Sequence, residues 1–485
     1  MANTESVPDQ QSNFVSSVPL LRHYGTDEEG LLVLPGMQPN SPRPVAGASV
    51  LQTASNVINV FMGIGLLSMP YAMRLSGGVG LLALAATTAL FCLSGKLIVH
   101  AFDRLPDSAP HTYPALGVAA LGPAGRYVVA GFALSEFFGG SCILLVVMWQ
   151  ELVTLLPDHG VLGLTPLAFA ALLAGAATIP LLLIPSFHKL SWLSMAGCIS
   201  SVLVTLTVMA AVGFDPDRSR MPDQPPAGHV AFAGLSIFQS VGIFAVSVSG
   251  HSSLPVLRSS MKNRQDFDIV LNLAFGSMFI VYGLVSSCGY YYFGSAASEL
   301  ITTDLATNSF FTGRFLLPGV TVDRVVTACI LVNAYTTYPS LVLVIQDMIV
   351  SVLPWANIHG SPRQPRRGVG QAIRLSVFAA GAAVAFMAYN VLGNAMSLVG
   401  GVCSMCTSLL LPSLFYLILH WKELPQWRRA GVVLVLAIGL ALLLLIVGQN
   451  VADLNHKTHQ RHNSTQPGVP SSNDLLQGLL YWPGG

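Results

Sequence analysis

The chain has 485 residues, of which 53% are hydrophobic and only 9% are charged, and its net charge is +1 at pH 7. Soluble domains carry roughly 25% charged residues, so this composition indicates a polytopic membrane protein. The small net charge gives no case for a nucleic-acid or acidic partner.

The first 46 residues form a polar tail without the charged, apolar and cleavable regions of a signal peptide. We expect this tail to be disordered and cytosolic, and the first span to direct membrane insertion. Within it, Asp27-Glu-Glu-Gly-Leu-Leu32 has the acidic dileucine form that cytosolic sorting adaptors read on endosomal, lysosomal or vacuolar cargo. A disordered acidic tail without a sorting role is the alternative.

Apolar windows of about 20 residues, long enough to cross a bilayer, occur eleven times along the chain. They lie at residues 47–73, 78–101, 126–156, 164–184, 190–213, 229–252, 268–293, 323–352, 371–392, 395–419 and 430–450. We therefore expect an all-α transmembrane domain over residues 47–450. The polar segment 451–485 would follow it as a separate tail.

The lysines and arginines predict the orientation of these spans. A cytosolic N-terminus places 16 of the 23 basic residues inside and 7 outside, in agreement with the positive-inside rule. Eleven spans then place the C-terminal tail in a lumen or outside the cell. That tail holds Asn463-Ser-Thr465, an N-glycosylation acceptor sequence, which fits the same topology.

The first span contains an unusual stretch, Asn56 to Ala72, in which Gly63 and Gly65 interrupt an apolar run that Pro70 closes. Glycine weakens a helix by about 1 kcal/mol relative to alanine. Backbone outside the helical ladder is tolerated at membrane depth only where it is buried in protein or lines a cavity. The stretch therefore predicts a broken helix at a polar binding site, with close helix packing as the alternative reading of the glycines.

The sixth span contains a second interruption, Phe238 to Pro255, at Ser247, Ser249, Gly250 and His251. It occupies in a second group of five spans the place that the first interruption has in the first group. Matching broken segments in two halves indicate an inverted repeat with a site near the midplane. A repeat of five plus five, with one added span, accounts for eleven.

Broken helices offer backbone groups as ligands. The N–H groups of Gly63, Ile64 and Gly65, ahead of Leu66, could hold a carboxylate, and the carbonyl groups from Val246 to Ser249 could hold an ammonium group. Together they predict a site for a zwitterion, with Gly250 allowing the second turn.

Few ionisable residues lie within the spans. Glu136 and His251 are the candidates for ion coupling or gating, because an acid or imidazole in hydrocarbon is costly. A structural hydrogen bond or an interfacial position is the alternative for each, and Glu151 and Asp347 are predicted to be interfacial. Side-chain oxygens for an ion or substrate could come from five further residues, which otherwise would bridge helices: Asn59, Asn333, Tyr335, Thr336 and Thr337.

Two cysteines, Cys403 and Cys406, form a CxxC pattern within a span. Without a second pair or a histidine cluster, the pattern favours close packing of small residues over metal or redox chemistry. We expect no metal and no cofactor.

Several motifs occur in an order that resembles the amino acid/auxin permease family, and within it the vacuolar amino acid transporters related to the vesicular inhibitory amino acid transporter. They are Asn59 to Ala72, Thr112 to Gly122, Ser249 to Lys262, Tyr291 to Gly294, Met396 to Gly400 and Leu411 to Tyr416. The resemblance covers about residues 46–450. It departs at Asn333-Ala-Tyr-Thr-Thr-Tyr338, which lacks the lysine common in relatives, and at Tyr113-Pro114-Ala115.

The resemblance implies a leucine-transporter-like fold, with amino acids held at spans one and six. It leads us to expect a proton-coupled antiporter or symporter of neutral amino acids in a vacuolar, lysosomal or vesicular membrane, and not an enzyme. A sodium-coupled plasma-membrane symporter and an amino-acid-sensing transceptor are the alternatives. The substrate, the coupling ion (H⁺ or Na⁺) and the lipid bilayer are the expected partners, together with a sorting adaptor at Asp27–Leu32.

Overall fold

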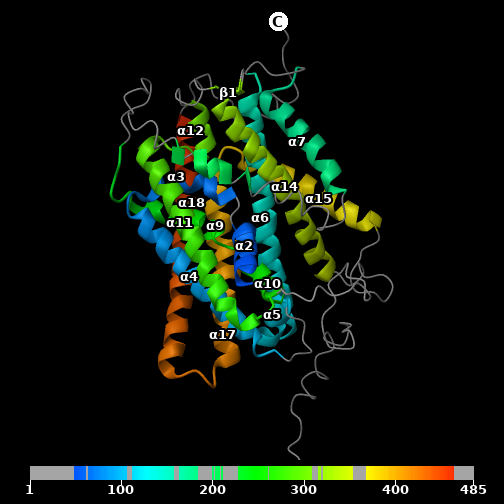
Figure 1. The fold of residues 1–485 in the computed structure, drawn as a ribbon, viewed down its shortest axis with the longest axis vertical. Helices are drawn as coiled ribbons and strands as arrows, with labels where there is room; N and C mark the ends of the chain where they lie inside the picture. The colour runs from blue at the N-terminus through cyan, green and yellow to red at the C-terminus, as the bar shows by residue number, and fades with distance from the viewer. Residues whose placement is uncertain are drawn as a thin grey trace, which may run out of the picture.

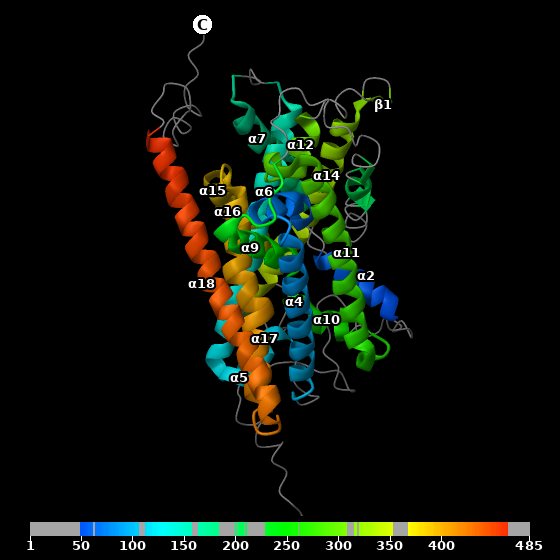
Figure 2. The ribbon, with the colours of Figure 1, turned by 90° about the vertical axis from the view of Figure 1, so that its left-hand side faces the viewer.

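The computed structural model describes residues 49–61, 64–105, 112–157, 163–183, 199–200, 202–207, 209–210, 228–259, 261–307, 315–317, 320–352 and 367–463. Its long helices run mainly along the longest axis of the molecule (Figure 1). In the view turned by 90°, the last long helix lies along the outer edge of the bundle (Figure 2).

The α-helices are α2 (Val50–Phe61), α3 (Met69–Ser76), α4 (Gly80–Phe102), α5 (Tyr113–Leu121), α6 (Pro123–Leu155), α7 (Pro166–Leu182), α9 (Ile237–Ser247), α10 (Leu254–Ser259), α11 (Phe267–Phe293), α12 (Ile301–Thr307), α14 (Val322–Val352), α15 (Arg367–Ala388), α16 (Leu392–Leu398), α17 (Leu411–His420) and α18 (Gln426–Asn463). Short 3-10 turns are η2 (Ile64–Ser68), η4 (Gly234–Ser236), η5 (His251–Ser253), η6 (Arg264–Asp266) and η7 (Gly294–Ala296). Two π-helical segments, η9 (Val399–Ser404) and η10 (Cys406–Leu410), join α16 to α17.

Within the described residues, eight helices are long and apolar enough to cross a membrane. The first predicted span is divided between α2 and α3, and the fourth, α7, has only 17 residues. The predicted fifth span, 190–213, lies mostly outside the described residues. An all-helical membrane architecture is therefore observed, while the count of eleven and the repeat of five plus five remain predictions.

One small ribbon departs from the all-α expectation. Strands β1 (Phe315–Leu317) and β2 (Val320–Thr321) pair antiparallel immediately before α14, with Phe315 opposite Thr321. The ribbon is too short to contribute a layer of its own, because a two-stranded hairpin alone is at best marginally stable.

Local sequence signals determine where several helices begin. At the start of α7, the Thr165 hydroxyl accepts a hydrogen bond from the Ala168 N–H group (3.3 Å), and Pro166 occupies the first turn. Thr112 caps α5 in the same way through Ala115. These are preferred helix starts, because the cap oxygen satisfies a free N–H group and proline needs no donor there.

Two helices form the centre of the packing. Helix α6 packs against α14, α5, α15 and α7, whereas α9 packs against α3, α16, α4 and η9. Helix α11 covers α2, α3 and α4. This arrangement brings α6 and the π-helical segment to the region where α2 and α9 end.

Candidate substrate and ion site

Both predicted interruptions are present. Helix α2 ends at Phe61 and is followed by the 3-10 turn η2 and then α3, in which Pro70 lies in the first turn. Helix α9 ends at Ser247, and the chain resumes as η5 and α10. Between them Gly250 has φ = 148°, a backbone conformation that residues with a Cβ atom rarely adopt.

The two interruptions contact each other. A Cβ atom placed on Gly65 would lie 2.9 Å from the Cα atom of Ser247, so only glycine fits there. On the second side, a Cβ atom on Gly250 would lie 3.0 Å from Cζ of Phe61. Residues 61 and 65 of the first interruption therefore pack directly on residues 250 and 247 of the second.

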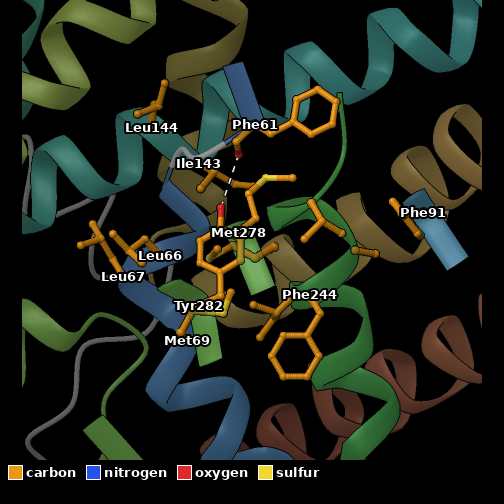
Figure 3. Close-up of a cluster of buried hydrophobic side chains, with 14 of the residues drawn as sticks. Phe61, Leu66, Leu67, Met69, Phe91, Ile143, Leu144, Phe244, Met278 and Tyr282 are labelled. Atoms are coloured by element: carbon orange, nitrogen blue, oxygen red, sulfur yellow. Dashed lines mark hydrogen bonds between the residues drawn. The ribbon is translucent and has the colours of Figure 1, made fainter. Parts of the chain in front are cut away.

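Tyr282 of α11 joins the same two helix ends. Its hydroxyl group donates a hydrogen bond to the carbonyl oxygen of Ser247 (2.9 Å) and lies 3.5 Å from the carbonyl oxygen of Phe61 (Figure 3). The side chain is fully buried. Sequence reasoning missed this residue, and its only local signal is a hydroxyl group inside an apolar span.

The backbone carbonyls of the second interruption already accept hydrogen bonds. Ser249 donates to the carbonyl oxygen of Val246 (3.1 Å), and Tyr282 donates to that of Ser247. A carbonyl oxygen has two lone pairs, so each can accept a further donor. The predicted use of these carbonyls for an ammonium group remains compatible with this geometry.

Glu136 of α6 lies beside the second interruption, inside a cluster of hydroxyl groups. Ser404 donates a hydrogen bond to one carboxylate oxygen and Thr407 donates one to the other, and both bonds are 2.7 Å long. The Ser404 and Ser249 hydroxyl oxygens are 3.1 Å apart, which connects the carboxylate to the chain after α9. The Glu136 side chain is only 7% exposed, so it lies in the interior of the protein.

Ser404 and Thr407 belong to the π-helical segments η9 and η10. π-Helical turns are rare and concentrate at functional sites. From the sequence, this span was notable for its CxxC pattern and for the family motifs at its two ends, and neither pointed to Ser404 or Thr407. The available signal was the set of hydroxyl residues Ser404, Thr407 and Ser408 within an otherwise apolar run.

His251 occupies a different environment. Its ring packs against those of Phe61, Phe91 and Phe275, with centroids 5.7 to 6.1 Å apart. Its Nε2 atom lies 2.9 Å from the carbonyl oxygen of Phe91 and therefore carries the hydrogen, because a carbonyl only accepts. Its Nδ1 atom is buried without a hydrogen-bond partner among the described residues. This arrangement fits a neutral imidazole in an aromatic cage.

The predicted ion or substrate ligands on α14, Asn333, Thr336 and Thr337, have two different environments. Asn333 lines a small cavity together with Leu66 of η2 and Leu144 of α6. Thr336 donates to the Asn333 carbonyl oxygen (2.9 Å), and Thr337 donates to the Asn333 side chain (3.4 Å). The two threonine hydroxyl groups thus bond back onto their own helix, while Asn333 faces the first interruption.

With this geometry established, comparison with known proteins identifies the family. The family model described as transmembrane amino acid transporter protein matches residues 46–451. The chain belongs to this family. Its members are membrane transporters, so the protein is a transporter and not an enzyme.

Curated relatives agree with the family match. The transporter is 27% identical to amino acid transporter AVT1B of Arabidopsis thaliana, over 80% of this chain and 68% of the relative. It is 25% identical to amino acid transporter AVT1E of the same plant, over 90% of this chain and 77% of the relative. The resemblance stated from the motifs is thereby confirmed.

Among solved structures, a mutant of the manganese transporter of Eremococcus coleocola superposes with a TM-score of 0.51 at 14% identity. The alignment covers 98% of this chain and 93% of that one. At this identity the likeness concerns the fold alone. It supports the fold of that protein for the described residues of this chain.

A second polar cluster of the transporter surrounds α12. Arg74 of α3 donates to the Ala297 carbonyl oxygen (2.8 Å), and Ser68 donates to the Glu299 carbonyl oxygen (2.7 Å). Glu151 of α6 accepts a hydrogen bond from Thr302 of α12. Glu151 is only 2% exposed, because α12 covers this end of α6, and its predicted position near a membrane interface stays a prediction.

The carboxyl group of Asp304 lies in the same cluster. The Ser298 N–H group donates to both of its oxygens, at 3.0 and 2.9 Å. Burial raises the pKa of Asp304 from 3.8 to about 6, against the opposing effects of the Ser298 hydrogen bonds and of Arg74. Burial also raises the pKa of Glu299.

Several predicted features fall where the structure gives no description. Gly63 lies outside the described residues, as do the sorting motif Asp27–Leu32 and most of the C-terminal tail. Only the backbone is described for Asn59 of α2, Ile64 of η2 and Asn463, the last residue of α18. These interpretations stay predictions.

Proposed function

We propose that the protein is a secondary active transporter that moves neutral amino acids across an endomembrane by alternating access, driven by a proton gradient. The observation that carries the proposal is the contact between two interrupted helices at Gly65 and Ser247, with Glu136 beside them. Interrupted membrane helices of this kind present free backbone groups to a zwitterionic substrate.

The chemistry of the two interruptions favours a neutral substrate. Among the described residues 61, 64–68 and 247–253, His251 is the only titratable side chain, and it is enclosed by aromatic rings. Backbone N–H groups near Gly65 and carbonyl groups near Ser247 suit the carboxylate and ammonium groups that all amino acids share. Glu136 would then act on the coupling ion.

Proton coupling is supported by the surroundings of Glu136. A carboxyl group held by two hydroxyl groups can be charged or neutral without losing its partners, because a hydroxyl group both donates and accepts. In the proposed cycle, spans one, two, six and seven rock against the rest, and Glu136 exchanges its proton as the second interruption moves. His251 would act in gating within the aromatic cage.

The proposal includes eleven spans in a five-plus-five inverted repeat with one added span. The N-terminal tail, 1–46, would be cytosolic, the transport domain would cover 47–450, and the tail 451–485 would be lumenal in a vacuolar, lysosomal or vesicular membrane. Endoglycosidase sensitivity that Asn463→Gln removes would support this topology. Protease access to residue 463 only from the cytosolic side would contradict it.

Uptake of radiolabelled amino acids into proteoliposomes tests the function directly. We expect uptake of neutral amino acids under an imposed pH gradient without sodium. Uptake that requires a sodium gradient and does not depend on pH would show that the coupling ion is Na⁺ and not H⁺. Substrate binding without flux under either gradient would point to a transceptor.

A glycine pair tests the location of the substrate site. Gly65→Leu should abolish uptake, because the added side chain would occupy the contact with Ser247. Gly131→Leu on α6 is the matched control, since a Cβ atom there meets nothing within 4 Å. Normal flux in Gly65→Leu would exclude this position from the site, provided that both variants reach the membrane in equal amounts.

A further inference from the structure

The helix that carries Ser404 and Thr407 is unusual over most of its central length. It is π-helical over Val399–Ser404 and Cys406–Leu410, between the α-helical ends α16 and α17. In an α-helix a shift of one residue turns each side chain by about 100°. A comparable slip here would turn Ser404 and Thr407 away from Glu136, so the register of this segment matters.

One end of the π-helical region is fixed by side chains from two other helices. The Tyr113 hydroxyl group of α5 donates to the carbonyl oxygen of Thr407 (2.6 Å). Ser94 of α4 donates to the carbonyl oxygen of Ser408. Both donors are buried, and they bond to backbone groups of the segment itself, which holds this end in place along its axis.

The other end is fixed by α18. Asn450 donates through Nδ2 to the Ser397 hydroxyl oxygen (2.8 Å), and its Oδ1 atom lies 3.3 Å from Nδ2 of Asn394. Asn450 and Ser397 are fully buried. One helical turn earlier on α18, Ile446 packs on Gly401, where an added Cβ atom would lie 3.0 Å from the Ile446 Cβ atom.

Two more polar side chains of α18 bond to Asn394, which donates to Asp453 (2.9 Å) and accepts from Lys457 (2.7 Å), but Asn450 alone of the three also holds Ser397 and is fully buried. Most of the helix carries exposed apolar side chains such as Leu434, Leu440 and Leu444, and it lies at the edge of the bundle (Figure 2). A buried asparagine on such a helix is costly to insert unless it finds partners on a neighbour. Its partners on α16, Ser397 and Asn394, lie seven and ten residues before Ser404.

We propose that Asn450 is a positioning residue for Glu136: by holding Ser397, it fixes the register of the π-helical segment so that Ser404 and Thr407 meet the carboxyl group. Asn450 does not touch the substrate or the ion. It makes α18, the added span, part of the coupling apparatus. The expected effect of Asn450 on transport rests on the proposed proton coupling. Its expected effect on the Glu136 carboxyl group rests on the hydrogen bonds alone.

The test compares Asn450→Leu, Ser404→Ala and the double variant, with Gln449→Leu as control. Gln449 is a half-buried amide on the adjacent position of α18. Two quantities are measured in proteoliposomes: the pH midpoint of amino acid uptake, and the infrared carboxyl band of Glu136, identified by its loss in Glu136→Gln. Thermal unfolding is recorded for every variant.

We expect Asn450→Leu to move the midpoint and the carboxyl band in the same direction as Ser404→Ala. The double variant should move them by less than the sum of the two single changes, because Asn450→Leu already weakens the Ser404 hydrogen bond that Ser404→Ala removes. Gln449→Leu should leave both unchanged. A carboxyl band in Asn450→Leu identical to that of the unmodified protein would overturn the inference, whatever the loss in thermal stability.

The two proposals fail separately. If the carboxyl band responds to Asn450→Leu and Ser404→Ala while the pH midpoint of uptake does not, the positioning role of Asn450 is supported and the proposal of proton coupling through Glu136 is rejected. If Ser404→Ala moves both quantities and Asn450→Leu moves neither, the coupling stands and α18 has no part in it.

Discussion

Glu136 and His251 are both ionisable, both buried and both close to the second interruption, yet their surroundings differ in kind. Glu136 faces hydroxyl groups, which can donate to a carboxylate or accept from a carboxylic acid. His251 faces three aromatic rings and has one carbonyl partner, so a second proton on its ring would find no acceptor among the described residues. Burial alone therefore does not identify a proton carrier. A proton carrier also needs hydrogen-bond partners for both its charged and its neutral form.

The strongest test of the comparison is Glu136→Gln. We expect proton-driven uptake to fall by about 100-fold, the order associated with losing a proton-transfer group. Exchange of labelled for unlabelled substrate without a pH gradient should persist. Glu423→Gln is the control, because Glu423 forms a surface ion pair with Arg104. Full gradient-driven accumulation by Glu136→Gln would remove Glu136 from the coupling mechanism.

A smaller effect on proton-driven uptake is expected when the Glu136 carboxyl group is kept and its hydroxyl partners are removed. In Ser404→Ala combined with Thr407→Val, the pH midpoint of uptake should move to higher pH by about one unit. The charged carboxylate loses two donors, worth about two units together at ~1.5 kcal/mol each, and the neutral acid loses the same hydroxyl groups as weaker partners, which offsets part of the shift. Ser413→Ala, a buried hydroxyl on the α17 part of the same helix, serves as control. A midpoint equal in both variants would mean that the cluster has no influence on proton exchange.

His251→Phe should leave the pH midpoint of uptake unchanged, since it keeps the aromatic packing and removes one hydrogen bond, worth about 1 kcal/mol. His251→Ala, which opens the cage, should slow transport more than His251→Phe does. Uptake that loses its pH dependence in His251→Phe would reverse the roles assigned to the two residues.

The smallest effect concerns Asp304, which lies outside the predicted spans and away from both groups. Because its folded-state pKa is raised to about 6, the folded protein binds more protons than the unfolded chain between about pH 6 and pH 4. Stability should therefore rise as pH falls through this window, by at most about 3 kcal/mol. Asp304→Asn should flatten that part of the dependence in thermal unfolding scans.

Transport by Asp304→Asn should keep the pH midpoint of the unmodified protein. A changed midpoint would show that α12 takes part in coupling. An unfolding profile that matches the unmodified protein between pH 4 and 6 would mean that Asp304 does not titrate there.

Sequence reasoning located the two interruptions because the cause is local. Glycine and proline break a helix wherever they occur, so Gly65 and Gly250 could be recognised from spacing and hydropathy. The cost of a carboxyl group in hydrocarbon likewise singled out Glu136. The local pattern could not show which partners these residues meet, and it gave no sign that α12 covers Glu151.

What the sequence by itself determined is the membrane class, the family, the position of both helix breaks and the presence of Glu136, since each follows from composition or from residues close together in the chain. Only the tertiary structure decided that Gly65 meets Ser247, that Tyr282 bridges the two ends and that Ser404 holds Glu136 from 268 residues away. Such contacts depend on how long helices pack and on where one helix changes its pitch. No local pattern encodes that geometry.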